Sequence, residues 1–308
     1  MRLALHALTE ELRRLKASGV KRVAVDEPTL ASLRRAVREA GSGLAKPSVA
    51  AVPPEPALAP APRAPSLAAV RAVTTAISVP VAATLPPAPV VSLPAGDKPT
   101  RWAALQSLVF NDSTCRANVR SGKKVVLGVG SLDARIMFVG EAPGAEEEIQ
   151  GEPFVGPAGQ LLTRMIQGMG LQRADVYIGN IMNWRPQLPV SGAGEQVGNR
   201  PPTEEEMRYC LPYLRAQIEI VKPALLVALG TTAAQGLLGF GAFKTLGEIR
   251  GKWRDFEGRP LMVTYHPSYI LRNQSNRSKR MIWEDLLQVM AQAELPISER
   301  QRGYFLDR

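Results

Sequence analysis

The pattern of apolar and polar positions changes near residue 100. From Arg101 onward, short continuous apolar runs alternate with stretches in which apolar residues recur every three or four positions. Continuous apolar runs are typical of strands buried on both faces, and the wider spacing is typical of helices packed on them. The pattern predicts strands at Ala134–Val139, Asp175–Gly179, Ala224–Leu229 and Pro260–Tyr265.

Helical spacing follows each of these runs. The predicted helices are Ala158–Met169, Thr203–Val221, Thr231–Leu238 and Lys279–Ala293. Thr203 and Glu206 have the spacing of a capping box at a helix start. The alternation predicts an α/β fold for residues 101–308, a three-layer sandwich with a central four-stranded parallel sheet flanked by helices.

The first hundred residues differ from the rest in composition and in their pattern of apolar positions. Residues 1–45 predict a short helical segment, because leucines share one helical face at Leu5, Leu8, Leu12 and Leu15. Residues 46–100 hold 13 of the 26 prolines, which predicts a disordered Pro/Ala-rich linker. The N-terminal segment is a candidate for docking a protein partner or for a solubilising arm.

Composition excludes several classes. The chain has 308 residues but two cysteines and two histidines, which excludes a disulfide scaffold and argues against a zinc site. No apolar run is long enough to span a membrane, and the N-terminus lacks a signal-peptide core. We therefore expect a cytoplasmic protein, and separately we expect a monomer.

Charge adds a hint about the partner. The net charge is +10, which favours a polyanion, although a basic surface is as often a solvated face. Nine basic residues lie between Lys244 and Arg280. Candidates for phosphate contacts in that stretch are Arg250, Lys252, Arg254, Arg277, Lys279 and Arg280.

Polar side chains follow the predicted strands at the points where they end. Glu141 follows the first, Asn180 the second, Thr231 the third and His266 the fourth. Carboxyl ends of parallel strands share one edge of the sheet, where such folds bind ligands. We therefore expect a carboxylate, a carboxamide, a hydroxyl and an imidazole to converge there.

The motifs around these residues resemble the uracil-DNA glycosylase superfamily. They are Gly140-Glu-Ala-Pro-Gly-Ala-Glu-Glu-Glu148, Gly151-x-Pro-Phe-Val-Gly-Pro-Ala-Gly159, Val176-Tyr-Ile-x-Asn180 and His266-Pro-Ser-Tyr-Ile-Leu-Arg272. The resemblance is strongest to family 4, whose members carry an iron–sulfur cluster. It implies a DNA-repair hydrolase that extrudes uracil from DNA, cleaves its N-glycosidic bond and leaves an abasic site.

The resemblance also implies roles for individual residues. Glu141 and His266 would be catalytic, the first positioning water and the second donating to uracil O2. Glu147 is a second candidate catalytic carboxylate, or part of a solvated acidic turn. Phe154 would stack under the base, and Asn180 would read its edge.

Other positions complete the expected site. Ala142 would contact uracil at the position where the best-known branch has Asp. Gly144 stands where that branch has a Tyr that excludes thymine. Thymine must therefore be rejected by another group, and Glu147 is a candidate. DNA contacts are expected from Gly144, Thr231, Ser268, Tyr269, Leu271 and Arg272.

The cluster cysteines of family 4 are incomplete. The four positions correspond to Asp112, Cys115, Trp184 and Cys210, and tryptophan offers no ligand atom. We therefore expect no metal and no cofactor. Two alternatives stay open: a non-catalytic binder or adaptor for uracil-containing DNA, and a glycosylase with altered lesion specificity, such as for hypoxanthine.

Overall fold

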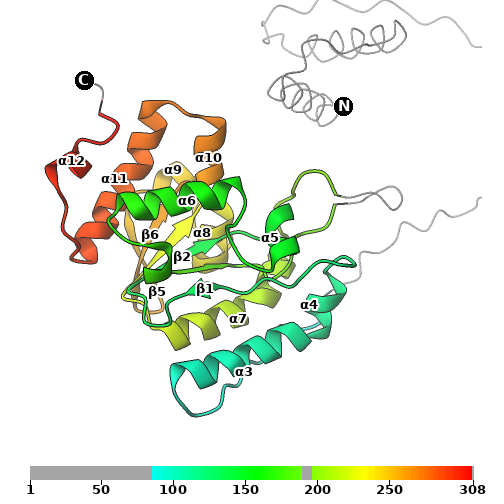
Figure 1. Ribbon diagram of the computed structural model, residues 1–308. Helices are drawn as coiled ribbons and strands as arrows, with labels where there is room; N and C mark the ends of the chain where they lie inside the picture. The colour runs from blue at the N-terminus through cyan, green and yellow to red at the C-terminus, as the bar shows by residue number, and fades with distance from the viewer. Residues whose placement is uncertain (1–84, 189–195, 307–308) are drawn as a thin grey trace, which may run out of the picture. The chain divides into compact units, whose positions relative to one another are not determined.

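A central sheet between two helical layers forms the body of the molecule (Figure 1). The computed structural model describes residues 85–188 and 196–306, so the predictions for residues 1–45 and for most of the linker lie outside it. Within the described ranges, no helix combines the length and hydropathy needed to cross a membrane.

The four predicted strands form the middle of the sheet and run parallel. They are β2 (Ile136–Gly140), β3 (Tyr177–Asn180), β4 (Leu225–Leu229) and β6 (Arg259–Thr264). Every residue of β2, β3 and β4 is buried, as expected for strands covered on both faces. The predicted α/β class and parallel core are confirmed.

The predicted strand number is wrong, because the sheet has six strands in the order β1-β3-β2-β4-β6-β5. The two additional strands, β1 (Val129–Gly130) and β5 (Trp253–Phe256), pair antiparallel at the edges. The first has only two residues, and the second carries the exposed Arg254 and Asp255 in its middle. Neither produces the apolar run by which a buried strand is detected.

Helices cover both faces of the sheet. One core cluster packs residues of α3 (Lys98–Asn111), α4 (Ser113–Ala117), α7 (Glu204–Val221) and α8 (Thr231–Leu238) against it. The other packs α6 (Pro157–Gly168), α10 (Pro267–Arg272) and α11 (Asn276–Gln292). Shorter elements are α5 (Ala145–Gln150), the 3-10 helix η1 (Arg173–Asp175), α9 (Leu246–Ile249) and α12 (Glu299–Arg302).

Local sequence sets the helix starts. The Thr203 hydroxyl accepts from the Glu206 amide at 3.2 Å, and the Glu206 carboxylate accepts from the Thr203 amide at 2.7 Å, which confirms the capping box at the start of α7. Helix α11 begins three residues before the predicted Lys279, because Ser275 caps it by accepting from the Ser278 amide.

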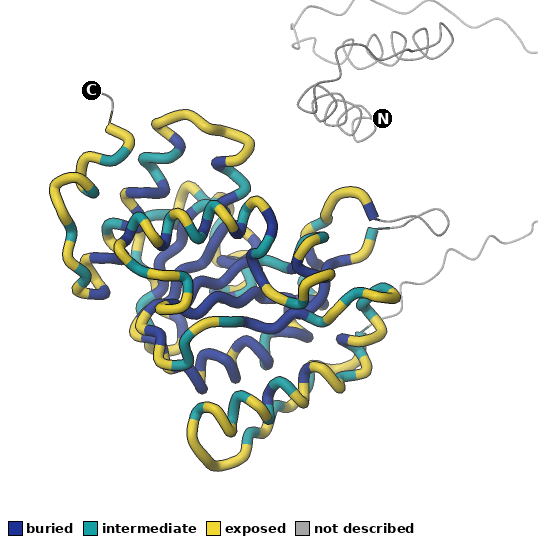
Figure 2. The backbone as a smooth tube through the Cα atoms, in the orientation of Figure 1, coloured by how far each residue is buried: buried dark blue, intermediate teal, exposed yellow. Residues whose placement is uncertain are grey.

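Alternation along the strands fixes the layers. In β2, Met137 and Val139 belong to the core cluster on the α7 face, whereas Ile136 and Phe138 belong to the one on the α11 face. Figure 2 shows the strands as the buried centre, with exposed positions on the outer sides of the helices. Burial on both faces leaves the carboxyl edge of the sheet as the place for polar chemistry.

Candidate active site

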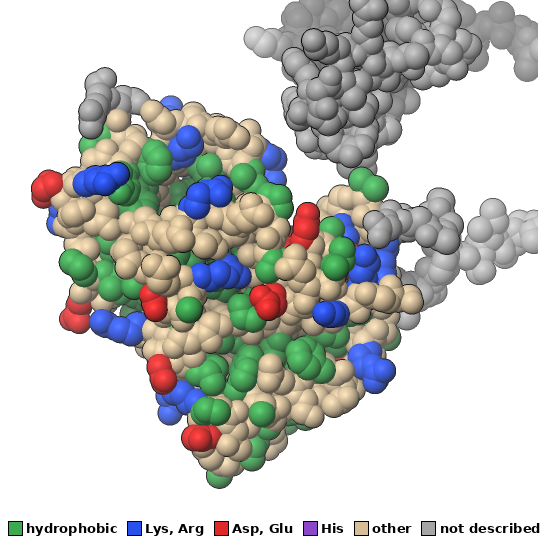
Figure 3. Space-filling view, in the orientation of Figure 1, with side chains coloured by type: hydrophobic (Ala, Val, Ile, Leu, Met, Phe, Trp, Pro, Cys, Tyr) green, Lys and Arg blue, Asp and Glu red, His purple; other side chains and the backbone are tan. Residues whose placement is uncertain are grey.

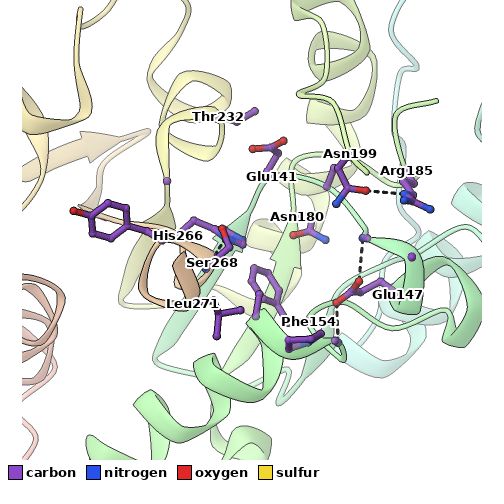
Figure 4. Close-up of a pocket in the computed structure, with 18 of the residues that line it drawn as sticks. Glu141, Glu147, Phe154, Asn180, Arg185, Asn199, Thr232, His266, Ser268 and Leu271 are labelled. Atoms are coloured by element: carbon purple, nitrogen blue, oxygen red, sulfur yellow. Dashed lines mark hydrogen bonds between the residues drawn. The ribbon is translucent and has the colours of Figure 1, made fainter. Parts of the chain in front are cut away.

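A cavity of about 870 Å³ opens at the carboxyl ends of the four parallel strands. Glu141 follows β2, Asn180 ends β3, α8 begins after β4, and His266 follows β6 (Figure 4). The six basic candidates for phosphate contacts do not line this cavity. The structure does bring together the other residues predicted to contact water, base or DNA: Glu141, Ala142, Gly144, Glu147, Phe154, Asn180, Thr231, His266, Ser268, Tyr269, Leu271 and Arg272.

Phe154 forms an aromatic wall of the cavity. Its φ of 55° is unusual for a residue with a side chain, and its ring lies 5.6 Å from that of His266 between centroids. A Cβ at Gly159 would lie 1.8 Å from the Phe154 carbonyl oxygen, so helix α6 approaches this backbone only through a glycine. Hydrogen bonds from the Val155 and Gly156 amides to the Glu147 carboxylate hold this loop in place.

Asn180 lies beside this aromatic ring and is 6% exposed. A Cβ at Gly140 would stand 2.4 Å from both the Asn180 Oδ1 and the Phe154 Cζ, so the glycine lets the two side chains share the cavity. Within the described chain, Asn180 Oδ1 is buried without a hydrogen-bond partner. An unpaired buried acceptor is costly, and the residue that carries it lines the cavity.

His266 caps helix α10 and is held in one orientation. Its Nδ1 accepts from the Ser268 amide at 3.2 Å and lies 2.9 Å from the Ser268 hydroxyl. Because Nδ1 acts as an acceptor, the ring proton of the neutral form resides on Nε2. Burial, together with the nearby Arg272 charge, lowers the pKa of His266 to about 4. The side chain is therefore a neutral donor near pH 7.

Glu141 provides a carboxylate directly after the end of β2. Burial raises the pKa of its side chain above the ordinary value of 4.5, and the nearby Thr232 side chain opposes the rise. Thr232 is 9% exposed in the first turn of α8. A carboxylate with a raised pKa in a cavity is suited to bind a water molecule and accept its proton.

Both carboxylate oxygens of Glu147 accept hydrogen bonds from backbone amides. One oxygen accepts from the Gly144 amide at 3.0 Å, and the other accepts from the Val155 and Gly156 amides at 3.1 and 3.0 Å. The carboxylate thus ties the loop after β2 to the loop that carries the aromatic wall. Residue type and spacing alone gave no signal of this bracing arrangement.

Sequence reasoning missed one side of the cavity. Arg185 is buried, pairs with buried Glu148 at 2.8 Å and donates from Nε to the Asn199 Oδ1 at 2.8 Å. Since arginine only donates, the Asn199 oxygen must face it, and the amide nitrogen points away from Arg185, into the cavity (Figure 4). The sequence features that could have indicated this contact are the dipeptides Arg185-Pro186 and Asn199-Arg200, which lie on either side of residues 189–195.

The rim of the cavity is apolar and basic. Leu271 is 38% exposed at the end of α10, and the neighbouring Arg272 is exposed beside it. The Tyr265 and Tyr269 rings stack at 4.4 Å between centroids. Among the charged side chains that Figure 3 shows over α6, α10 and α11, most are Lys or Arg. Exposed cations near an exposed apolar side chain suit a nucleic-acid backbone and its groove.

Arg250, one of the predicted phosphate contacts, is engaged inside the protein, and Arg280 also donates to Glu284 and to the Arg302 and Tyr304 carbonyls. The Arg250 guanidinium donates to the buried Asp285 carboxylate at 2.8 and 3.2 Å and lies 5.4 Å from the centre of the Tyr265 ring. The Thr264 hydroxyl also donates to Asp285, at 2.6 Å. This network anchors the end of β6 to α11 directly before the histidine motif.

The residues at the predicted cluster positions belong to a hydrogen-bonded group centred on Asp112. Asp112 accepts from the Tyr209 and Tyr213 hydroxyls at 2.8 and 2.9 Å and from the Cys115 amide at 2.6 Å. Burial opposes its ionisation, but these bonds hold the pKa of Asp112 below its ordinary value. Trp184, 1% exposed, fills the adjoining volume. An iron–sulfur cluster needs thiolates at these positions, and the residues present do not fit one.

Comparison with known proteins agrees with the motifs. A family model described as the uracil DNA glycosylase superfamily matches residues 127–287. A type-4 uracil-DNA glycosylase of Thermotoga maritima is 45% identical over 163 residues, which are 53% of this chain and 79% of that protein. A type-4 enzyme of Pyrobaculum aerophilum is 40% identical over 57% of this chain and 87% of its own.

A type-5 uracil-DNA glycosylase of Pyrobaculum aerophilum is more distant, at 31% identity over 53% of this chain and 73% of its own. The type-4 branch therefore fits better than the type-5 branch. The match covers all the strands of the sheet and the residues that line the cavity, whereas α3 and α4 lie before it. The chain belongs to the uracil-DNA glycosylase superfamily.

Proposed function

We propose that this protein removes uracil from DNA by hydrolysing the bond between uracil N1 and the deoxyribose C1′. The observation that carries the proposal is the buried, unpartnered Asn180 Oδ1 beside the Phe154 ring, in one cavity with Glu141 and His266. A base inside a duplex cannot reach this cavity, so the nucleotide is extruded into it.

Asn180 supplies the base specificity. Its Oδ1 accepts from uracil N3–H, and its amide nitrogen donates to uracil O4. Cytosine presents an acceptor at N3 and a donor at N4, so both groups would be left unpaired in a buried site. Phe154 contributes stacking under the ring, worth roughly 1–3 kcal/mol.

His266 and Glu141 act on the two sides of the breaking bond. The electron pair of the C1′–N1 bond leaves with uracil, and the Nε2–H of neutral His266 stabilises the charge that develops on O2. Glu141 holds a water molecule that adds to C1′ and gives up a proton to the carboxylate. Glu141 releases the proton it took from water to solvent, and the uracil anion takes one up from solvent, which restores the carboxylate and completes the products, free base and abasic DNA.

Glu147 shapes the cavity in this proposal. Its three backbone hydrogen bonds hold the Gly144 and Phe154 loops together. Water activation therefore falls to Glu141, whose carboxylate accepts no hydrogen bond from a backbone amide of residues 85–188 or 196–306. The Glu147 brace supports a role in limiting space beside the C5 position of the base, where thymine carries its methyl group.

DNA contacts come from the rim. Ser268, Tyr269 and Arg272 lie on α10, and Thr231 is exposed in the first turn of α8. Arg272 would pair with phosphate, and Leu271 would occupy the gap left by the extruded nucleotide. Gly144 leaves room for the backbone to approach.

The proposed reaction uses no iron–sulfur cluster, because the Asp112 and Trp184 positions carry no thiolate. We expect purified protein to be colourless and free of stoichiometric iron. The double substitution Asp112→Cys and Trp184→Cys restores the missing thiols and serves as a matched comparison. Iron in the unsubstituted protein at four atoms per chain would contradict the proposal.

A glycosylase assay tests the proposed function. A labelled oligonucleotide with a single uracil is incubated with the protein and then treated with alkali, which cleaves the strand at an abasic site. We expect scission with uracil and none with cytosine or thymine. Retention of the DNA without scission would favour the non-catalytic binder, and scission only at hypoxanthine would favour altered lesion specificity.

A further inference from the structure

The loop that carries the Phe154 ring is held from two sides. The two backbone amides that follow Phe154 donate to the Glu147 carboxylate. On the other side, the Pro153 carbonyl oxygen accepts from Arg173 Nη2 at 2.6 Å. A residue with a side chain keeps a φ of 55°, as Phe154 does, only where its surroundings enforce it. Both attachments therefore bear on the direction of the ring.

Arg173 joins this loop to helix α6. Its Nη1 donates to the Thr163 hydroxyl oxygen at 3.3 Å, while Nη2 donates to the Pro153 carbonyl. The Thr163 hydroxyl donates in turn to the Gly159 carbonyl at 3.0 Å. Gly159 is the residue through which α6 packs on the Phe154 backbone. One planar guanidinium thus sets the spacing between the loop and the helix.

The guanidinium acts from outside the cavity. Arg173 is half-buried in η1 and is not among the residues that line the cavity. Its two hydrogen bonds within the described chain go to uncharged oxygens. Arg173 is therefore placed to act on a base in the cavity through the position of Phe154.

We propose that Arg173 is a positioning residue for Phe154, holding the loop so that the ring stacks on the extruded uracil. This inference rests on the proposed function and deepens it. A displaced ring loses part of its contact with the base, and the alignment of the reacting atoms is lost with it. The rigid fork of arginine holds two acceptors in a fixed relation, whereas a lysine ammonium on its flexible stem does not.

The test compares Arg173→Met and Arg173→Lys, each with and without Phe154→Ala. Methionine keeps much of the apolar stem but has no N–H donor, and lysine keeps the charge without the fork. Arg135→Met is the matched control, because Arg135 is an exposed arginine that pairs with Glu294 at 3.3 Å and lies outside the cavity. Single-turnover release of uracil from DNA is measured for every variant, together with its Tm.

We expect Arg173→Met to release uracil about tenfold more slowly than the wild type, as for a displacement smaller than 1 Å, and Arg173→Lys to fall between the two. Phe154→Ala alone should be about 5- to 150-fold slower, the equivalent of one lost stacking contact. In the Phe154→Ala background the Arg173 substitutions should have little further effect, because the ring through which they act is gone. Arg135→Met should equal the wild type.

The Phe154 ring also offers a readout that needs no catalysis. Its NMR signals are sensitive to its placement, because the His266 ring lies 5.6 Å away between centroids. Carbon-13 spectra of the phenylalanine rings are recorded without DNA, and the Phe154 signals are assigned by their loss in Phe154→Ala. These signals should shift in Arg173→Met and stay in place in Arg135→Met.

An Arg173→Met rate loss that persists in full in the Phe154→Ala background would overturn the inference, and so would Phe154 signals that do not move. A wild-type rate in Arg173→Lys would also overturn it, because the charge alone would then suffice. Absence of uracil release from the wild-type protein would instead overturn the proposed function. The NMR comparison would then still decide whether Arg173 positions the ring.

Discussion

Because Gly140 has no side chain, the Phe154 ring and the Asn180 amide fit into one cavity. In Gly140→Ala the new methyl group would stand 2.4 Å from both Asn180 Oδ1 and Phe154 Cζ. Displacement of either group by about 1 Å should slow uracil release about 100-fold. Single-turnover kinetics measure this effect.

Gly247→Ala is the matched control for that substitution. Gly247 is exposed in α9, and the nearest atom to its added Cβ would be the Thr245 hydroxyl at 3.9 Å. We expect its rate and Tm to equal those of the wild type. A Gly140→Ala variant with wild-type activity would show that Asn180 and Phe154 do not both bind the base.

His266 should make the protein sensitive to acid. Its pKa is lowered from 6.5 to about 4 in the folded state, so the unfolded state binds more protons between these values. Folding stability should therefore be fully present above about pH 6.5 and be lost as the pH falls toward 4. Urea denaturation over this range measures the slope.

His266→Asn isolates that contribution, because asparagine retains the ability to cap α10. We expect its stability to fall less steeply than that of the wild type between pH 6.5 and pH 4. Identical slopes in the two proteins would show that the imidazole is not buried as described.

At the scale of elements, α4 is fastened to α7 where family 4 has its cluster. Asp112 caps α4 and accepts from the Tyr209 and Tyr213 hydroxyls of α7. Asp112→Ala should cost about 2–3 kcal/mol of unfolding free energy, from the lost cap and the lost hydrogen bonds. Tyr209→Phe and Tyr213→Phe should each cost about 1 kcal/mol.

A double-mutant cycle separates this linkage from general packing. In the Asp112→Ala background, the two phenylalanine substitutions should cost little, since their partner is already gone. Additive losses of unfolding free energy, measured by chemical denaturation, would mean that the tyrosines and Asp112 act independently. These hydrogen bonds would then not replace the cluster in joining α4 to α7.

Sequence pattern was informative where an element is long or buried on two faces. The parallel strands and the capped start at Thr203 followed from local signals, and the strand-end rule brought Glu141, Asn180 and His266 to one edge. Edge strand β1, with two residues, has no periodic signal. The Glu147 brace and the Arg185–Asn199 contact depend on loop conformations, which residue spacing does not specify.

For the whole molecule, the charge of +10 should make DNA binding salt-dependent. Binding of an uncleavable uracil analogue in DNA should weaken linearly on a log–log plot against salt. Arg272→Gln should reduce the magnitude of that slope by about one, as for one lost phosphate contact. Fluorescence anisotropy over a salt series measures it.

Arg215→Gln is the control for that slope. Arg215 pairs with Glu257 at 2.7 Å and does not line the cavity. It should leave the slope unchanged. An Arg272→Gln slope equal to that of the wild type would remove Arg272 from the DNA interface.

Direct detection of free uracil tests the central proposal most sharply. Full-length protein is incubated with DNA that carries one uracil, and the released base is quantified by mass spectrometry, with Glu141→Gln and His266→Ala in parallel. We predict one uracil per site from the wild type and at least about 100-fold slower release from each variant. Tight binding of the uracil-containing DNA with no free base, from the wild type as from the variants, would contradict the proposed hydrolysis.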